Sequence, residues 1–192
     1  MEMLGHRRLG VTRQQAWDAL NDPATLQKCI PGCDRFELTG ENEYTVALAL
    51  KIGPVSAKFT GKVTLSDIDP PEGYRLGFEG QGGVAGFAKG ASSVTLKPVE
   101  DDAGACELDY TVQAQVGGKI AQMGQRLIDG AAKSTADDFF RRFDAEMQRR
   151  YGPETAQPES PTEASTDMQT EKTGAVAGFM QKIGFGKKGD GD

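Results

Sequence analysis

The sequence predicts an α+β fold in which a curved antiparallel sheet wraps around one long C-terminal helix. Apolar residues alternate with polar ones along successive segments between residues 43 and 114, the period-two pattern of half-buried strands. After residue 118 the apolar spacing changes to three and four, which is typical of an amphipathic helix. The sheet therefore has one apolar face and the helix one apolar stripe, and each can cover the other.

The chain is expected to open with a strand over residues 3–11 and two short helices. Thr12 fits the N-cap of a helix that begins at Arg13, and Asp22-Pro23 ends this helix because the residue before proline disfavours helical angles. A second helix is expected over residues 24–29, where the chain reaches the turn Pro31-Gly32.

Five strands on short turns make up the expected meander: residues 43–52, 55–65, 74–79, 94–97 and 106–114. The glycine-rich segment 80–90 interrupts them and is expected to be a mobile loop at the rim of the sheet. A strand follows it where a phosphate-binding loop would need a helix, so nucleotide binding is not expected. Phe87 in its middle would then be placed to gate a cavity.

The final helix is expected to run for about 30 residues, or roughly 45 Å. Its apolar stripe consists of Ile120, Met123, Leu127, Ala131, Thr135, Phe139, Phe143 and Met147. The folded domain should thus span residues 1–151. Residues 152–170 are rich in Pro, Glu, Thr, Ser and Gln and are expected to form a disordered linker.

An amphipathic segment is expected at residues 171–192, after the linker. Four apolar residues fall at helical spacing, with a further aromatic and two lysines nearby, and together they are the candidate contacts with a membrane or a partner protein: Val176, Phe179, Met180, Ile183, Phe185, Lys182 and Lys187. Glycines within the segment each cost about 1 kcal/mol of helix stability, so it should fold only on contact. A bilayer and a groove on a partner enzyme are both candidate surfaces.

Composition argues against several classes of protein. With 22 basic and 28 acidic residues the net charge is −6, which argues against nucleic acid as a partner. No apolar run approaches the length of about 18 residues that a spanning helix needs, and the first residues lack the apolar core of a secretory signal. Three cysteines (Cys29, Cys33 and Cys106) and the single His6 suggest neither a disulfide framework, nor a metal site, nor a catalytic pair.

Four segments of the domain resemble a known family: TRQQAWDALNDPATLQKCIPGCDRFE, LKIGPVSAKFTGKVTLSDIDPPEGYRL, GQGGVAGFAKGASSVTL and VGGKIAQMGQRLIDGAAKSTADDFFRRF. The combination of NDP, IPGC, KIGPV and GGKIAQMGQRLI is similar to the CoxG family of carbon monoxide dehydrogenase subunits, within the START-like helix-grip superfamily. The resemblance covers nearly all of residues 1–150, and the tail carries no fixed family motif.

This resemblance implies a helix-grip fold and a non-catalytic accessory protein of molybdenum-type carbon monoxide dehydrogenases or related oxidoreductases. Members of the family are linked to attaching the enzyme to the cytoplasmic membrane and to carrying a quinone in the cavity. For this chain that implies menaquinone or ubiquinone as a bound molecule, the dehydrogenase and the membrane surface as partners, and a cytoplasmic location, peripheral at the inner face of the cytoplasmic membrane.

A hydrophobic ligand would lie between the inner face of the sheet and the helix. The residues expected to line this space are Tyr44, Leu48, Phe59, Leu76, Phe78, Phe87, Leu108, Tyr110, Met123 and Leu127. Tyrosine hydroxyls would be its polar points. Two alternatives remain open: a helix-grip enzyme of the cyclase or dehydratase kind, and a scaffold whose own side chains fill the space. The volume between sheet and helix separates the scaffold from the carrier.

Overall fold

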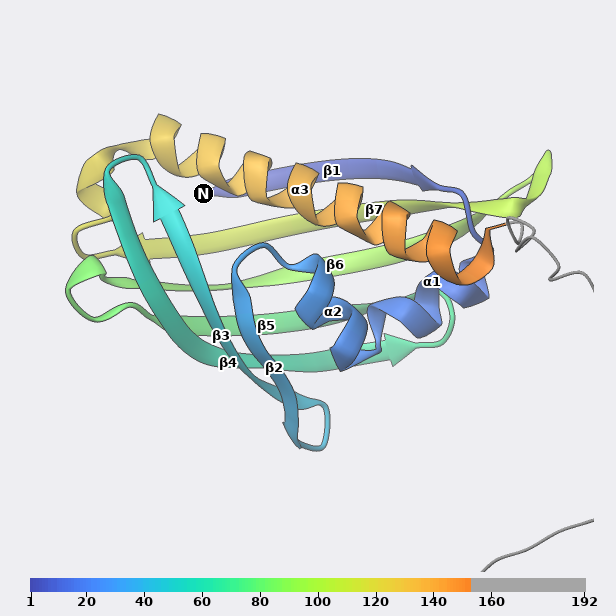
Figure 1. Ribbon diagram of the computed structural model, residues 1–192, viewed down its shortest axis with the longest axis horizontal. Helices are drawn as coiled ribbons and strands as arrows, with labels where there is room; N and C mark the ends of the chain where they lie inside the picture. Colours follow the sequence, from blue (N-terminus) through green and yellow to red (C-terminus); the bar gives the residue numbers. More distant parts are fainter. Residues whose placement is uncertain (153–192) are drawn as a thin grey trace, which may run out of the picture. The chain divides into compact units, whose positions relative to one another are not determined.

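Seven antiparallel strands form one curved sheet in the computed structural model, which describes residues 1–152 (Figure 1). The strand order is β1-β7-β6-β5-β4-β3-β2, so each strand from β2 onward lies beside the next, and β1 pairs with β7. The strands are β1 (Glu2–Leu9), β2 (Cys33–Gly40), β3 (Glu43–Ile52), β4 (Val55–Asp69), β5 (Gly73–Gln81), β6 (Phe87–Val99) and β7 (Asp102–Gly117). The expected amphipathic segment, and all but Gly152 of the expected linker, lie outside the described residues.

The predicted meander is confirmed, with two differences. Strand β2 was not expected, and it precedes β3 at the edge of the sheet. The glycine-rich segment is mostly strand, because β5 continues to Gln81 and β6 already begins at Phe87. Only a short loop with one 3-10 turn, Gly83–Ala85, remains between them. Phe87 is therefore a strand residue: a Cβ on Gly117 of β7 would overlap its ring, so the ring packs over that glycine.

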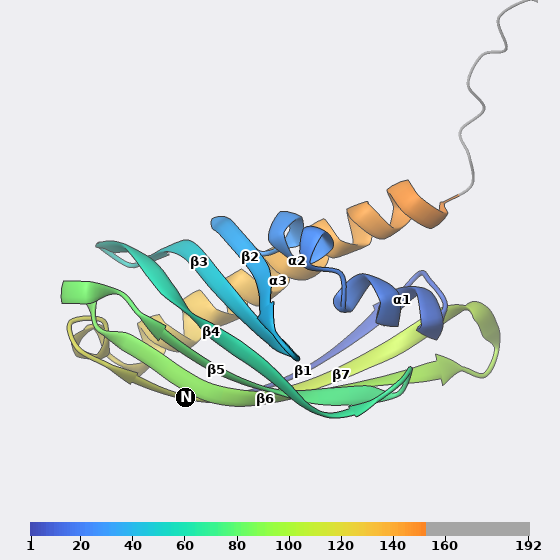
Figure 2. The ribbon, with the colours of Figure 1, turned by 90° about the horizontal axis from the view of Figure 1, so that it is seen from below.

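The helices lie on the concave side of the sheet (Figure 2). Helices α1 (Arg13–Leu20) and α2 (Pro23–Cys29) follow β1, and α3 (Gln125–Tyr151) follows β7. Thr12 caps α1 as expected: its hydroxyl accepts from the Gln15 backbone N–H at 3.2 Å, and the Gln15 side chain accepts from the Thr12 N–H at 3.0 Å. This reciprocal pair satisfies two N–H groups that would otherwise have no partner.

The long helix begins later than the sequence pattern suggests. A separate 3-10 turn covers Ala121–Met123, and Gly124, with φ of 87°, breaks the path before α3 starts at Gln125. Within α3 the inward face passes through Ile128, which is buried, whereas Leu127 lies at the edge of that face and is 46% exposed. The expected stripe is therefore wrong at Leu127, whereas Ile120, Phe143 and Met147 are buried as expected.

The apolar core is divided into three clusters rather than one. The largest joins α1, α2 and the C-terminal half of α3 to the middle of the sheet, and Phe143 and Met147 are almost wholly buried in it. A second is built around Tyr44 on β3, and a third around Phe59 and Ile120 near the start of α3. This division leaves room for unfilled space between the clusters.

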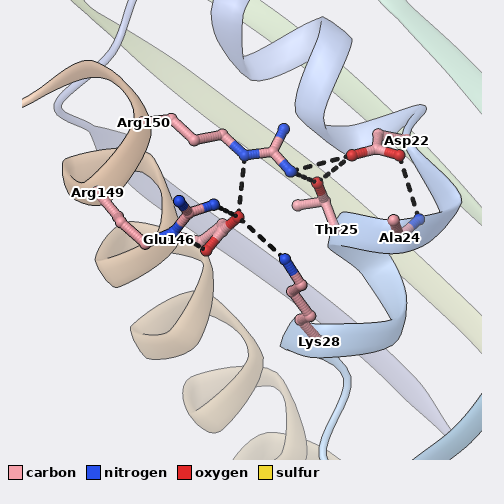
Figure 3. A network of polar contacts seen from close by, with 7 residues as sticks. All are labelled: Asp22, Ala24, Thr25, Lys28, Glu146, Arg149 and Arg150. Carbon is pink, nitrogen blue, oxygen red and sulfur yellow. Dashed lines mark hydrogen bonds and ion pairs between the residues drawn. The ribbon is translucent and has the colours of Figure 1, made fainter. Parts of the chain in front are cut away.

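A polar network fixes the C-terminal end of α3 to α2 (Figure 3). We call it the α2–α3 clasp: Asp22, Thr25, Lys28, Glu146 and Arg150. The Arg150 guanidinium donates to Glu146 Oε1 at 2.9 Å, to Asp22 Oδ2 at 3.1 Å and to Thr25 Oγ1 at 2.5 Å. Because Thr25 is fully buried and also donates to Asp22, the clasp is an anchored contact rather than a surface ion pair.

Candidate functional site

An apolar cavity lies between the concave face of the sheet and the N-terminal half of α3. Its volume is about 470 Å³, and it is apolar on nearly all sides. The sheet contributes side chains from β3, β4, β5 and β7, among them Leu48, Phe59 and Phe78, and α3 contributes Ile128 and Phe139. A volume of this order is typical of small-molecule sites in proteins, roughly 300–1,000 Å³.

A second cavity of about 390 Å³ continues toward α1 and α2. It is lined by Tyr44, Tyr74, Leu76 and Leu108 from the sheet, together with Leu26 of α2. The two cavities share part of their lining: Ile30, Val46, Leu48, Val63, Phe78, Tyr110, Phe139 and Phe140. Because the same side chains border both spaces, the two cavities adjoin one another.

Small residues on α3 account for the space. The helix presents Ala131, Ala132, Thr135 and Ala136 to the larger cavity. Toward its C-terminus the inward residues become large, as at Phe143, and the core closes around them. Near the start of α3 the sheet faces small side chains, whereas further along the helix it faces aromatic rings. The small side chains do not fill the space to the packing density of a protein interior, about 0.75, so a void remains.

Seven of the ten residues expected to line the ligand space border one or both cavities: Tyr44, Leu48, Phe59, Leu76, Phe78, Leu108 and Tyr110. Phe87, Met123 and Leu127 do not border them. Phe87 packs over Gly117, Met123 belongs to the 3-10 turn before α3, and Leu127 is 46% exposed.

Several lining residues were missed by sequence reasoning. Ile128, Ala132, Ala136 and Phe140 border the larger cavity from α3, and each lies one residue after a member of the expected stripe. A stripe read at the spacing of Ile128, Ala132, Ala136 and Phe140 would have found them. The two stripes are adjacent on one helix and both border the cavity, since Ala131, Thr135 and Phe139 of the first stripe also line it.

Tyrosine side chains form part of the lining of the smaller cavity. Tyr44 and Tyr74 border the smaller cavity, and the Tyr74 ring lies 5.7 Å from the ring of Trp17, edge to face. Burial, with a smaller effect of the neighbouring Tyr44, raises the pKa of Tyr74 well above its usual range. Its hydroxyl therefore stays protonated at all ordinary pH values and can donate a hydrogen bond to a carbonyl oxygen.

The larger cavity approaches the surface between β3 and α3. A surface hollow of about 400 Å³ lies there, and it shares Pro31, Leu50, Lys51, Ala131 and Thr135 with the cavity. Arg126 and Leu127 form the outer rim of this hollow. We call it the β3–α3 portal. The shared side chains thus lie between the cavity and the hollow at this place.

The titratable side chains do not form a recognisable catalytic group within residues 1–152. His6 borders neither cavity and lies on the outer surface, where its Nδ1 is 2.7 Å from Asp109 Oδ1. Among the same residues no three His, Cys, Asp or Glu side chains gather as metal ligands would. Burial raises the pKa of both Cys29 and Cys106 to about 11, so these thiols are poor nucleophiles.

Comparison with known proteins identifies the family. The model of the CoxG family, described as a carbon monoxide dehydrogenase component, matches residues 5–148. The chain belongs to the CoxG family. Comparison with curated proteins gives no match.

Solved structures agree with the helix-grip fold of this CoxG protein. A conserved protein from Geobacillus kaustophilus is 37% identical, with a TM-score of 0.73, and the match covers 78% of this chain and 96% of that one. A START superfamily protein from Mycobacterium smegmatis is 9% identical with a TM-score of 0.60, covering 78% and 98%. The ZhuI aromatase/cyclase from Streptomyces sp. R1128 is 12% identical with a TM-score of 0.59, covering 78% and 94%. At such low identity the last two matches show the fold alone.

The described part of this CoxG protein gives no sign of a membrane span: no helix within residues 1–152 combines the length and the apolar character that crossing a bilayer requires.

Proposed function

We propose that this protein binds a hydrophobic ligand, a quinone or a lipid, between the sheet and α3. As a non-catalytic accessory protein it would link a carbon monoxide dehydrogenase or related molybdenum-type oxidoreductase to the cytoplasmic membrane. The observation that carries the proposal is the pair of adjoining apolar cavities, about 470 and 390 Å³, in a member of the CoxG family. A scaffold filled by its own side chains would not leave this space.

The shape of the space favours a long molecule with one polar end. Tyr44 and Tyr74 line only the smaller of the two cavities, and the larger cavity is almost wholly apolar and shares lining residues with the β3–α3 portal. A quinone ring would accept hydrogen bonds from Tyr44 or Tyr74 at the closed end. Its isoprenoid chain, either that of menaquinone or that of ubiquinone, would then extend toward the portal along Leu48 and Ala136.

Ligand binding can be tested with the single tryptophan as an internal probe. Trp17 packs on Tyr74 beside the smaller cavity, so a quinone bound there should quench its fluorescence. Ubiquinone-1 and menadione are the probes, and native mass spectrometry of protein purified without organic solvent shows what is bound already. Saturable quenching, or a co-purified quinone or lipid, supports the carrier. If micromolar ligand causes no quenching and no quinone or lipid co-purifies, the carrier function is refuted.

A matched pair of variants places the binding within the cavity. Ala136→Phe puts a ring into the larger cavity, and Ala145→Phe puts the same ring on the exposed side of the same helix. We expect A136F to weaken quenching by at least tenfold and A145F to leave it unchanged. Equal effects of the two substitutions would place the ligand elsewhere.

Membrane linkage is the second part of the proposal, and the residues expected to carry it are those of segment 171–192. A chain ending at Tyr151 should float with liposomes more weakly than the full chain, or should no longer capture the dehydrogenase in a pull-down. Weaker flotation alone assigns the segment to lipid, and loss of capture alone assigns it to the enzyme. If both properties are unchanged, the segment has no part in the linkage.

A further inference from the structure

Three loops meet at the end of the molecule where α3 begins (Figures 1 and 2). They are the β3–β4 turn, the β5–β6 turn and the connection from β7 to α3. We call their residues, 51–57, 81–88 and 115–128, the loop end. The Ile120 N–H donates to Ala85 O at 2.9 Å, and a Cβ on Gly53 would lie 3.7 Å from Leu127 Cδ1. These contacts join the three loops into one surface.

Two large apolar side chains project from this surface. Val84 is 95% exposed at the tip of the 3-10 turn between β5 and β6, and Leu127 is 46% exposed in the first turn of α3. Exposed apolar residues are common on soluble proteins, and Leu4 and Leu38 are exposed elsewhere on this one. Exposure alone therefore does not mark a binding surface; the charge around Val84 and Leu127 does.

The loop end is basic on an acidic protein. It contains Lys51, Lys119 and Arg126, all exposed, and not one Asp or Glu, although the whole chain has a net charge of −6. Within residues 1–152 none of the three cations takes part in an ion pair, whereas Lys58, Lys62 and other basic residues outside the loop end do. Three unneutralised cations beside protruding apolar side chains match an anionic lipid surface in both charge and hydrophobicity.

This basic surface also borders the portal. Lys51, Arg126 and Leu127 line the β3–α3 hollow, which shares its wall with the larger cavity. A bilayer in contact with these three residues would thus lie against the portal, which shares lining residues with the larger cavity. A hydrophobic molecule moving between the bilayer and the cavity through the portal would then have a short path through water.

We propose that the loop end docks directly on the anionic surface of a bilayer, with Val84 and Leu127 entering the interface and the three cations contacting lipid phosphates. This contact is separate from any made by segment 171–192. It rests on the proposed function in one respect, namely that the cavity takes up a membrane-soluble molecule. The projecting tips favour lipid over a protein partner, because a deformable bilayer can accept them without a preformed pocket.

A fluorophore at position 84 tests the contact in the full-length chain. NBD is attached to Val84→Cys in a Cys33→Ser background, since Cys29 and Cys106 are fully buried and only Cys33 is accessible. Vesicles of phosphatidylcholine with one-quarter phosphatidylglycerol should shift the NBD emission to the blue and expose it to quenching by spin-labelled lipid. A label at Leu38→Cys, exposed in β2, is the matched control and should not respond.

Charge variants of equal total charge locate the surface. The triple variant K51Q/K119Q/R126Q should raise the lipid concentration that gives half of the NBD shift by about 100-fold, since each cation near an anionic leaflet contributes about fivefold to partitioning. The control triple K89Q/K133Q/R142Q removes three basic residues that have no ion pair within residues 1–152 and lie outside the loop end. It should change the value less than threefold.

Three outcomes would overturn the proposal: no response at position 84, equal responses at positions 84 and 38, or equal effects of the two triple variants. A response at position 84 that requires the dehydrogenase and ignores vesicles would also overturn it, in favour of a protein partner. Quinone quenching of Trp17 is measured on the same preparations. If the protein binds quinone but the NBD label at position 84 does not respond to vesicles, only the membrane contact of the loop end is refuted. If neither quinone quenching nor an NBD response is observed, the carrier function is refuted as well.

Discussion

Alanine substitutions at three positions of α3 should have effects that follow the position of the helix over the cavity. Leu127 keeps 46% of its surface exposed, so its truncation removes about half of the 1.5–3 kcal/mol that full burial contributes, about 1 kcal/mol. Ile128 is 7% exposed but borders the cavity, and I128A should cost about 2 kcal/mol, at the lower end of such truncations. Phe143 has no exposed surface, and F143A should cost about 3–5 kcal/mol.

Urea unfolding followed by Trp17 fluorescence measures these free energies, with the slope of the transition as the check that unfolding remains two-state. Quinone quenching of the same tryptophan should weaken in I128A and stay unchanged in L127A. If L127A costs as much as F143A, or if it weakens quinone binding while I128A does not, then Leu127 faces the cavity and the helix phase described above is wrong.

Three other predictions concern charge, thiols and capping. Hydrogen bonds from Arg149 are the main reason why the pKa of Glu146 is lowered from 4.5 to about 2. The stability that Glu146 contributes is therefore complete above pH 4.5 and is lost as the pH falls toward 2. The free energy of unfolding of E146Q should depend less steeply on pH in that window than that of the unmodified protein. Iodoacetamide at pH 8 should modify Cys33 and leave Cys29 unmodified until the protein unfolds, as peptide mass spectrometry would show. Thr12→Ala should lower the free energy of unfolding by about 0.5–2 kcal/mol, because it removes the capping box of α1; a loss below the error of a urea titration would contradict the cap.

The strands and the late helix could be predicted because their apolar spacing is regular. The stretch from Tyr44 to Ile52 has an apolar residue at every second position, and the structure places it in β3. Strand β2 escaped prediction because it is an edge strand with Phe36 as its one buried residue, and charged neighbours hide the alternation. A strand with a single buried residue has no alternation of apolar and polar residues from which it could be predicted.

The glycine-rich segment was misjudged for a physical reason. A glycine-rich sequence predicts a loop, yet Gly90 lies in β6, where a Cβ would collide with Gln113 O on β7. The glycine is there because the neighbouring backbone comes close, which no property of residues 80–90 alone reveals. The cavity volumes could likewise not be predicted from the sequence, because they depend on the distance of Ala132 and Ala136 from the sheet.

The uneven attachment of α3 has a consequence for local opening of the backbone. Its last turns are held by Phe143, Met147 and the α2–α3 clasp, while its first turns rest on methyl groups over a void. Amide hydrogens of the last turns should therefore exchange at a rate near that of global unfolding, and those of the first turns much faster. An occupant of the cavity would supply the missing contacts to the first turns alone. Occupancy would thus be recorded as slower deuterium uptake between Ile128 and Ala136, with the remainder of the helix unchanged.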